Sequence, residues 1–317
     1  MHPSVTESAG RHNACAITMS NAPLSKNPPL CEGPDPQPRK PRYAVPAGAI
    51  DCHCHVFEDQ TQYPLTPLRS YTPPLCTFND YLRMSETLGV ERMVQVNAST
   101  YGFDNTVTLD LIAKLGQKRA LGVAGVAPDA DERTIRKLHD GGMRGVRLST
   151  MVKGYGGPEF LGVIAKTIKP FGWHVQLHVD KVGEIATLEQ QLLDHPTPIV
   201  FDHLGRVRGG EGVNAAGFQA LLRILKQRND CWVKLSSFYR LSDSGAPAYA
   251  DMQPIAQALL AARPDRMVWG SNWPHPIWDG LMPNDGDLLD LVGDWCGDAA
   301  TLQRVLVDNP AQLYGFK

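Results

Sequence analysis

The chain has 317 residues, of which 43% are hydrophobic and 20% charged, and its formal net charge is −2 at pH 7. This composition is that of an ordinary globular protein with enough apolar material for one large core or two smaller ones. The balanced charge excludes a chain-wide attraction to nucleic acid or anionic membranes, and no apolar run approaches the roughly 18 residues that span a bilayer. The odd number of cysteines, seven, favours reduced thiols in a cytoplasmic enzyme.

Residues 1–45 differ in composition from the rest of the chain. They are rich in proline, poor in large apolar residues and without periodicity. Such a segment cannot bury enough surface to offset the entropy lost on ordering. We therefore expect a disordered or surface-draped N-terminal extension over residues 1–45, followed by a single domain over residues 46–317.

From Ala49 onward, short apolar runs alternate with longer amphipathic stretches. The predicted strands are Ala49–Val56, Arg92–Val96, Leu121–Val126, Gly145–Leu148, His174–Val179, Ile199–His203, Cys231–Leu235 and Met267–Gly270. The predicted helices are Phe78–Leu88, Asn105–Leu115, Asp131–Asp140, Glu159–Phe171, Lys181–Leu193, Asn214–Lys226 and Tyr249–Ala262, with a last one after Asp287. Apolar strands that each precede a helix are typical of a parallel sheet covered by helices. Eight such units over roughly 270 residues predict an α/β fold, the closed (β/α)8 or TIM-like barrel. The alternative, an open doubly wound sheet, is less favoured because the first strand is not followed by a glycine-rich dinucleotide-binding fingerprint.

Four histidines fall at the carboxyl ends of the predicted strands, where barrels of this kind carry their chemistry. His53 and His55 are two residues apart on the first strand, so both imidazoles can face the barrel interior. Taken alone, this pair is more simply explained as hydrogen-bonded core histidines. However, His178 and His203 end two other strands. Four histidines at one barrel mouth indicate a functional site.

Three arginines lie at or just after the ends of predicted strands: Arg147, Arg206 and Arg240. Guanidinium groups make planar bidentate pairs with carboxylates, so three of them predict an anionic substrate with more than one carboxylate. The alternative is that they pair with aspartates at the same strand ends as part of the scaffold, and we expect at least one to do so.

Five segments carry a resemblance to a known family, and they occur in the family's order: Asp51–Phe57 (DCHCHVF), Gly142–Arg147 (GMRGVR), Phe201–Arg206 (FDHLGR), Val268–Pro276 (VWGSNWPHP) and Asn309–Tyr314 (NPAQLY). The chain resembles the amidohydrolase-2 branch of the amidohydrolase superfamily. Within this branch it is similar to 2-pyrone-4,6-dicarboxylate lactonases and their relatives, which include sulfomuconolactone hydrolases and a galactarolactone isomerase.

The resemblance implies a barrel of the metal-dependent hydrolase type that opens a small carboxylate-bearing lactone, of the muconolactone or pyrone dicarboxylate type, in the degradation of aromatic compounds. It implies that His53, His55 and His203 polarise the lactone carbonyl. The residues that it implies for binding the substrate's carboxylates and neighbouring oxygens are Tyr71, Ser99, Arg147, Lys153, Arg206 and Arg240.

Two positions depart from the lactonase pattern. Asn272 stands where the pattern has the aspartate presumed to activate water, and an amide can orient water but cannot take up its proton. His178 stands where the dicarboxylate lactonase is expected to have a tyrosine. In metal-bearing members of the superfamily the fifth-strand histidine is a ligand, so His53, His55 and His178 are candidate ligands for one zinc or manganese ion. Metal-independent catalysis by the histidines and arginines is the alternative.

Lactone hydrolysis is the favoured function, with a small anionic lactone as the partner and neither nucleic acid nor membrane expected. Intramolecular lactone isomerisation is the main alternative, because a substrate hydroxyl that replaces water does not need the carboxylate that Asn272 replaces. A metal-dependent decarboxylase and a non-catalytic dicarboxylate-binding barrel are less favoured. Loss of the aspartate supports the binding barrel, but a decaying site would not keep four inward histidines beside three arginines.

Overall fold

The computed structural model describes residues 28–317 and contains one sheet of eight parallel strands. In spatial as in chain order they are β1 (Ile50–Cys54), β2 (Arg92–Val96), β3 (Ala120–Ala124), β4 (Met143–Ser149), β5 (His174–His178), β6 (Ile199–Phe201), β7 (Cys231–Leu235) and β8 (Met267–Trp269). Backbone hydrogen bonds from Asn272 N to His53 O (2.7 Å) and from His55 N to Trp273 O (2.8 Å) join the segment after β8 to β1. These bonds close the sheet, so the predicted (β/α)8 barrel is confirmed.

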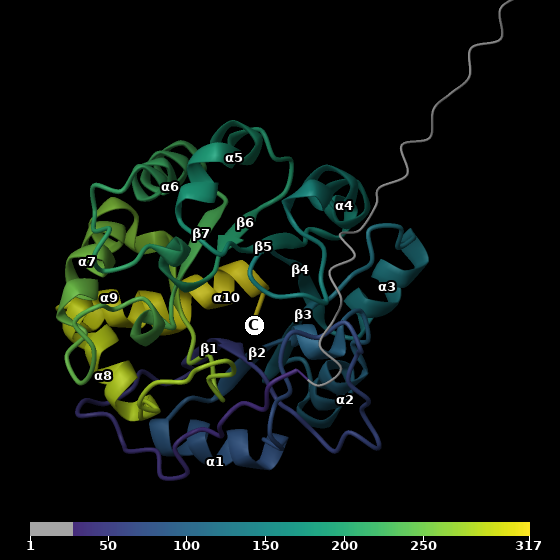
Figure 1. The fold of residues 1–317 in the computed structure, drawn as a ribbon, viewed down its shortest axis with the longest axis horizontal. Coiled ribbons are helices and arrows are strands. Elements are labelled where there is room, and N and C mark those ends of the chain that lie inside the picture. The colour runs from purple at the N-terminus through teal and green to yellow at the C-terminus, as the bar shows by residue number, and fades with distance from the viewer. Residues whose placement is uncertain (1–27) are drawn as a thin grey trace, which may run out of the picture.

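Helices surround the strands on all sides (Figure 1). They are α1 (Phe78–Leu88), α2 (Thr106–Leu115), α3 (Glu132–Asp140), α4 (Leu161–Ile168), α5 (Gly183–Leu193), α6 (Ala216–Gln227), α7 (Gln253–Ala262), α8 (Asp285–Cys296), α9 (Ala299–Gln303) and α10 (Asn309–Tyr314). The helix predicted over residues 159–171 is shorter than expected, because Lys169–Phe171 forms a 3-10 turn. Pro170 has no N–H for an α-helical hydrogen bond at that position.

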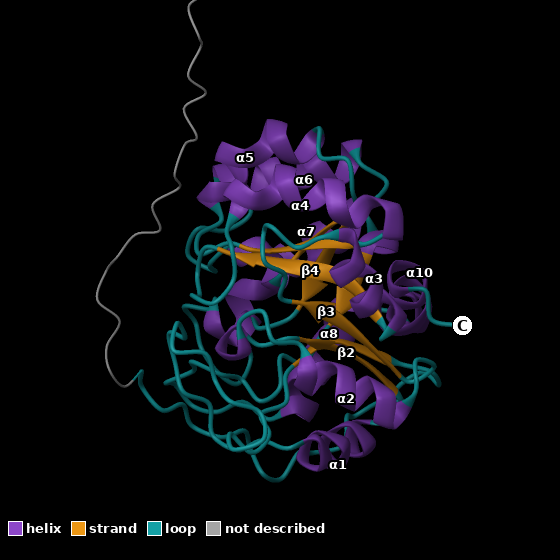
Figure 2. Cartoon of the chain, turned by 90° about the vertical axis from the view of Figure 1, so that its right-hand side faces the viewer, coloured by secondary structure: helices purple, strands orange, loops and turns teal. Residues whose placement is uncertain are grey.

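The two ends of the barrel differ in chemistry. At the amino ends of the strands the interior is apolar, with Ile50, Val94 and Val268 packed together. The C-terminal helix α10 covers this end, and Tyr314 packs edge-on against His174 at the start of β5, with 5.3 Å between ring centroids. Most loops gather at the opposite end (Figure 2). The interior therefore opens to solvent-facing loops only at the carboxyl ends of the strands.

An irregularity in β1 turns His53, and His55 just after the strand, toward this open end. The register between β1 and β2 shifts between Asp51 and Cys54, so Ile50 and Cys52 pack in the apolar interior while His53 lies against interior side chains of other strands. A bulge of this kind re-aims the side chains that follow it. Strand β8 approaches closely here, since a Cβ atom on Gly270 would lie 2.6 Å from the Cβ of His53. Glycine at position 270 thus lets β8 close against the histidine-bearing strand.

Residues 28–45 run along the outside of the barrel. Cys31 N donates a hydrogen bond to Thr72 O (2.8 Å), and the Arg42 side chain pairs with Asp290 and Asp294 of α8. The rest of the expected N-terminal extension, residues 1–27, lies outside the described residues. In residues 28–317, none of the helices has the length and apolar character required to traverse a bilayer.

We expect Gly270→Ala to lower the free energy of unfolding by about 1–3 kcal/mol, because the added methyl group meets the backbone of His53 and not a flexible side-chain end. Gly162→Ala is the matched control, because Gly162 lies in α4 with no atom within 4 Å of the added Cβ. The free energy of unfolding of this variant should be unchanged or slightly raised. Urea denaturation measures both, and equal stability of the two variants would show that the approach of β8 to β1 is not tight.

Candidate active site

A pocket opens at the carboxyl ends of the strands. It is lined by His55, Tyr71, Ser99, Arg147, Met151, Val152, His178, His203, Arg206, Arg240, Asn272, Pro276 and Ile277. Nine of the eleven predicted site residues are in this lining. His53 lies below it, with its ring 4.7 Å from that of His203. Lys153 is exposed in the loop after β4 and does not line the pocket.

Two of the histidines are held through Nδ1. His55 Nδ1 is 2.7 Å from the carbonyl oxygen of Val96, and His203 Nδ1 is 2.7 Å from Ser236 Oγ. A carbonyl oxygen only accepts hydrogen bonds, so His55 carries its hydrogen on Nδ1 and has a lone pair on Nε2. A histidine fixed through Nδ1 in this way presents Nε2 to a metal ion or a substrate.

His178 has the opposite tautomer. Its Nδ1 lies 3.2 Å from Ser149 Oγ, which also accepts hydrogen bonds from the backbone N–H groups of Met151 (3.1 Å) and Val152 (3.2 Å). These two bonds occupy both lone pairs of the hydroxyl, so its hydrogen is directed at His178 Nδ1. The imidazole hydrogen of His178 is therefore on Nε2, which makes this nitrogen a hydrogen-bond donor.

The four histidines are uncharged at neutral pH. Burial lowers the pKa of His53, His178 and His203 well below the usual value, and it lowers the pKa of His55 to about 3. The positive charge of Arg147 lowers the pKa of each of them further. Neutral imidazoles can bind a metal ion, donate a hydrogen bond or accept one, according to their tautomer.

A buried carboxylate lies directly below the pocket. Asp202 Oδ2 accepts hydrogen bonds from Arg147 Nε and Nη2, both at 2.9 Å, and Asp202 Oδ1 is 3.2 Å from His53 Nδ1. Burial alone would raise the pKa of Asp202, but Arg147, His53 and Lys234 together hold it well below its usual range. Arg147 is thus the arginine that pairs with an aspartate of the scaffold, as we expected of at least one of the three.

Lys234 is a second cation in this cluster, and the sequence did not indicate it. Its side chain is fully buried, and Nζ donates hydrogen bonds to Cys52 O (2.8 Å) and Gln176 Oε1 (2.6 Å) and lies 3.6 Å from Asp202 Oδ1. Burial lowers the pKa of Lys234 to about 8, although Asp202 counteracts this. The signal that could have found it is its place two residues before Ser236, at an inward position of β7.

Arg206 and Arg240 have no acidic partner. In residues 28–317, neither guanidinium lies within 4.0 Å of a carboxylate, and their hydrogen bonds go to the backbone oxygens of Asp180 and Pro276 and to the hydroxyl of Tyr239. Burial and repulsion from Arg240 lower the pKa of Arg206. Two neighbouring guanidinium groups without a counter-ion favour the binding of an anionic ligand.

The loops that form the pocket contain strained backbone. In residues 28–317, all eight non-glycine residues with positive φ follow β6, β7 or β8: His203, Leu204, Arg206, Ser237, Tyr249, Asn272, His275 and Ile277. Each such residue costs roughly 1–3 kcal/mol and persists only where its surroundings impose the conformation. This concentration at one end of the barrel accords with a functional site there.

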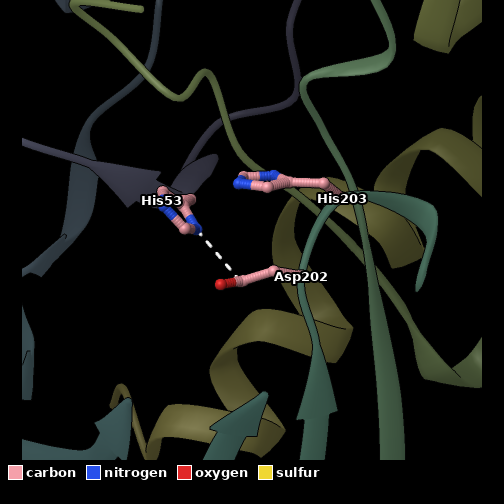
Figure 3. Close-up of side chains that lie close together, drawn as sticks. All are labelled: His53, Asp202 and His203. Atoms are coloured by element: carbon pink, nitrogen blue, oxygen red, sulfur yellow. Dashed lines mark ion pairs between the residues drawn. The ribbon is translucent and has the colours of Figure 1, made fainter. Parts of the chain in front are cut away.

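One group of side chains in the described part of the chain has the proximity that a metal site requires. Ligand atoms of His53, Asp202 and His203 lie within 4.8 Å of one another (Figure 3). Among the described residues, the buried His53 Nε2 atom has no hydrogen-bond partner, as expected of an atom that binds an ion. The residues therefore fit a divalent ion, but the group differs from the predicted set of His53, His55 and His178. The predicted set of His53, His55 and His178 stays a prediction.

The amidohydrolase family model matches residues 50–316. The chain belongs to this family. It is 37% identical to a 4-sulfomuconolactone hydrolase of Rhizobium radiobacter, over 90% of this chain and 96% of that protein, and 35% identical to a 2-pyrone-4,6-dicarboxylate hydrolase of Comamonas testosteroni, over 87% and 93%. A D-galactarolactone isomerase of Agrobacterium fabrum is 30% identical, over 86% and 93%.

A solved structure agrees with these relatives. A probable 2-pyrone-4,6-dicarboxylic acid hydrolase from Acinetobacter baumannii, with citric acid bound, superposes with a TM-score of 0.70 at 26% identity, over 85% of this chain and 100% of that chain. The predicted membership of the amidohydrolase family is confirmed, and so is the predicted similarity to the lactonase subgroup.

We expect Asp202→Asn to lower the free energy of unfolding by about 3–5 kcal/mol, because it leaves Arg147 and Lys234 buried without a counter-ion. Glu132→Gln is the control, since it breaks the exposed pair with Arg136 and should leave the stability nearly unchanged. Thermal or urea denaturation measures the difference. A loss for Asp202→Asn no larger than that of the control would mean that the cluster does not depend on the carboxylate.

Proposed function

We propose that this protein hydrolyses a small lactone that carries anionic groups, of the muconolactone or pyrone dicarboxylate type, in the degradation of aromatic compounds. The proposal rests on one observation. The same pocket is lined by neutral histidines and by Arg206 and Arg240, which have no acidic partner among residues 28–317. The relatives named as hydrolases of a sulfomuconolactone and of a pyrone dicarboxylate support it. Citric acid, the ligand of a related structure, has the same carboxylate chemistry.

The arginines position the substrate through its acid groups. Arg206 and Arg240 are free to bind two carboxylates or sulfonates. Arg147 is bound to Asp202 through Nε and Nη2, so only its other N–H groups can contact the substrate. Tyr71 and Ser99 supply hydroxyl groups in the same lining. Lys153 is exposed in the β4 loop, so it would meet the substrate only at the entrance.

The reaction adds water to the lactone carbonyl carbon and breaks the ring C–O bond, so that the product contains one more water than the substrate. The Nε2–H of His178 is a donor for the oxygen that gains charge, and the lone pair of His55 Nε2 accepts a hydrogen bond from the attacking water. His203 is the remaining pocket histidine that can accept the proton of this water and pass it to the ring oxygen that leaves. Asn272 orients the water.

We further propose that His53, Asp202 and His203 hold one divalent ion, zinc or manganese. When bound, such an ion would polarise the carbonyl and lower the pKa of water, and His203, then a ligand, would no longer be the group that accepts the proton of this water. The two buried cations that already neutralise Asp202 weaken its attraction for the ion, so the imidazoles would provide most of the binding.

Metal analysis tests this extension. Protein purified without chelator or nickel should contain about one equivalent of zinc or manganese by mass spectrometry, since structural and catalytic sites of this kind bind one ion. The ion should be lost in His203→Ala and retained in His139→Ala, whose imidazole is outside the site and bonded to Trp173. A metal-free protein that still opens lactones would contradict the extension and leave the lactonase proposal intact.

We propose a cytoplasmic location. The six described cysteines, which are Cys31, Cys52, Cys54, Cys76, Cys231 and Cys296, are all unpaired. Reduced thiols are usual in reducing compartments.

Lactone isomerisation is the second candidate, favoured by Asn272 and by the galactarolactone isomerase among the relatives. Incubation with a panel of muconolactones, pyrone dicarboxylates and sugar-acid lactones separates the two reactions. Hydrolysis adds the mass of one water and releases acid, whereas isomerisation leaves the mass unchanged. Unchanged mass with a rearranged product would replace the hydrolase proposal, and no turnover of any lactone in the panel would refute both.

We expect Arg206→Met and Arg240→Met each to raise KM about 10- to 100-fold for a lactone with two anionic groups, because each removes a charge-assisted contact worth roughly 1.5–3 kcal/mol. The effect should be much smaller for a neutral lactone. Arg208→Met is the control, since Arg208 is exposed and paired with Asp243. Equal effects on charged and neutral lactones would show that these arginines do not bind the substrate's anionic groups.

A further inference from the structure

Three buried side chains behind the pocket form a chain of close polar contacts that the proposed reaction does not use. Asp285, the first residue of α8, has Oδ1 3.2 Å from His275 Nε2. His275 Nδ1 is 2.9 Å from the hydroxyl oxygen of Tyr239, which lies in the 3-10 turn after β7. All three are at most 1% exposed. The chain runs from a helix on the outside of the barrel to the pocket wall.

The far end of this chain holds two residues of the pocket lining. The hydroxyl oxygen of Tyr239 accepts hydrogen bonds from Asn272 Nδ2 (3.0 Å) and Arg240 Nε (3.2 Å). Both nitrogens can only donate, so they occupy the two acceptor positions of the phenol oxygen. The proton that Tyr239 and His275 share therefore lies between the phenol oxygen and His275 Nδ1, while His275 Nε2 lies 3.2 Å from Asp285 Oδ1.

This direction of hydrogen bonds decides which way the Asn272 amide faces. Its NH2 group is held by Tyr239, so its carbonyl oxygen is the atom left to face the pocket. The same result follows if the shared proton moves from Tyr239 to His275, because the phenolate oxygen also accepts. Asn272 is held in a left-handed backbone conformation with φ of 60°, which restricts the side chain further.

The surroundings of Tyr239 reinforce its role as an acceptor. Its ring packs edge-on against Trp278 and His275, with centroids 5.3 Å and 5.2 Å away. The charged and titratable groups that face its hydroxyl are Arg240 and His275, with Asp285 behind His275. Burial alone would raise the pKa of Tyr239, but Arg240 and His275 lower it below its usual value.

We propose that Tyr239, backed by His275 and Asp285, is a positioning residue that fixes Asn272 with its carbonyl oxygen toward the substrate and aims the Arg240 guanidinium into the pocket. The inference rests on the proposed lactone chemistry. It gives Asn272 a defined part in that chemistry. Its carbonyl oxygen accepts a hydrogen bond from the attacking hydroxyl group, of water or of the substrate, so that a lone pair of the hydroxyl oxygen points toward the lactone carbonyl.

A double-mutant cycle tests the inference. Tyr239→Phe keeps the ring and removes the acceptor, so kcat should fall about 10- to 100-fold, as when an oriented hydrogen bond to the reacting atoms is lost. In an Asn272→Ala background the same substitution should change kcat less than threefold, because the amide through which it acts is gone. Equal losses of kcat in the two backgrounds would overturn the inference, since a merely structural role is independent of Asn272.

Asp285→Asn, which keeps the shape of the side chain, is the second variant if Tyr239→Phe does not fold. It removes the charge that orients His275 and should also lower kcat in the native but not in the Asn272→Ala background. Equal losses in the two backgrounds would again overturn the inference.

A titration tests the inference without turnover. The pKa of each of the other eight tyrosines is raised, mainly by burial, so Tyr239 should be the first to ionise when tyrosinate absorbance is followed with rising pH. Tyr239→Phe should abolish this first step, and Tyr249→Phe, the control, should retain it. A first step that survives in Tyr239→Phe would refute the acceptor role. Failure of the wild type to turn over any lactone would instead refute the proposed function alone.

Discussion

The buried carboxylate of Asp202 is the interaction on which the interior of this barrel depends. It joins side chains of four other strands, with Arg147 from β4, Gln176 from β5, Lys234 from β7 and His53 from β1. Two cations cannot remain desolvated in a barrel interior without an anion to balance them. The cluster forms a polar layer between the apolar end that α10 covers and the pocket at the carboxyl ends. It therefore sets the depth at which the chemistry takes place.

Above this layer, the pocket contains two groups of side chains with different roles. The histidines are kept neutral by burial and by the positive charge of Arg147, so they act through oriented lone pairs and hydrogens. The arginines without acidic partners supply the charge that an anionic substrate needs. Hydroxyl groups beside the pocket, with the carboxylate of Asp285 behind one of them, fix the direction of the hydrogen bonds of two pocket residues. Ser149 does this for His178, and Tyr239 does it for Asn272.

The fold could be predicted from the sequence because its signals are local. Each strand is a short apolar run and each helix an amphipathic stretch, and eight alternations leave few arrangements other than a closed barrel. The positions at the strand ends and the family resemblance together predicted eleven site residues, of which nine line the pocket, since parallel strands bring their carboxyl ends together. Lys234 was missed because a lysine within an apolar run does not signal burial, and Lys153 was included although it lies at the surface.

The sequence by itself thus determined the barrel, the family and the chemical character of the pocket: several histidines, arginines and one asparagine at the strand ends. Only the tertiary structure decided what each of these groups can do. The tautomer of His178 depends on Ser149, which is 29 positions away, and the orientation of Asn272 depends on Tyr239, which is 33 positions away. The candidate metal-binding group likewise combines β1 with the segment after β6. A hydrogen bond has a direction, and its direction is fixed by partners that come together only when the barrel closes.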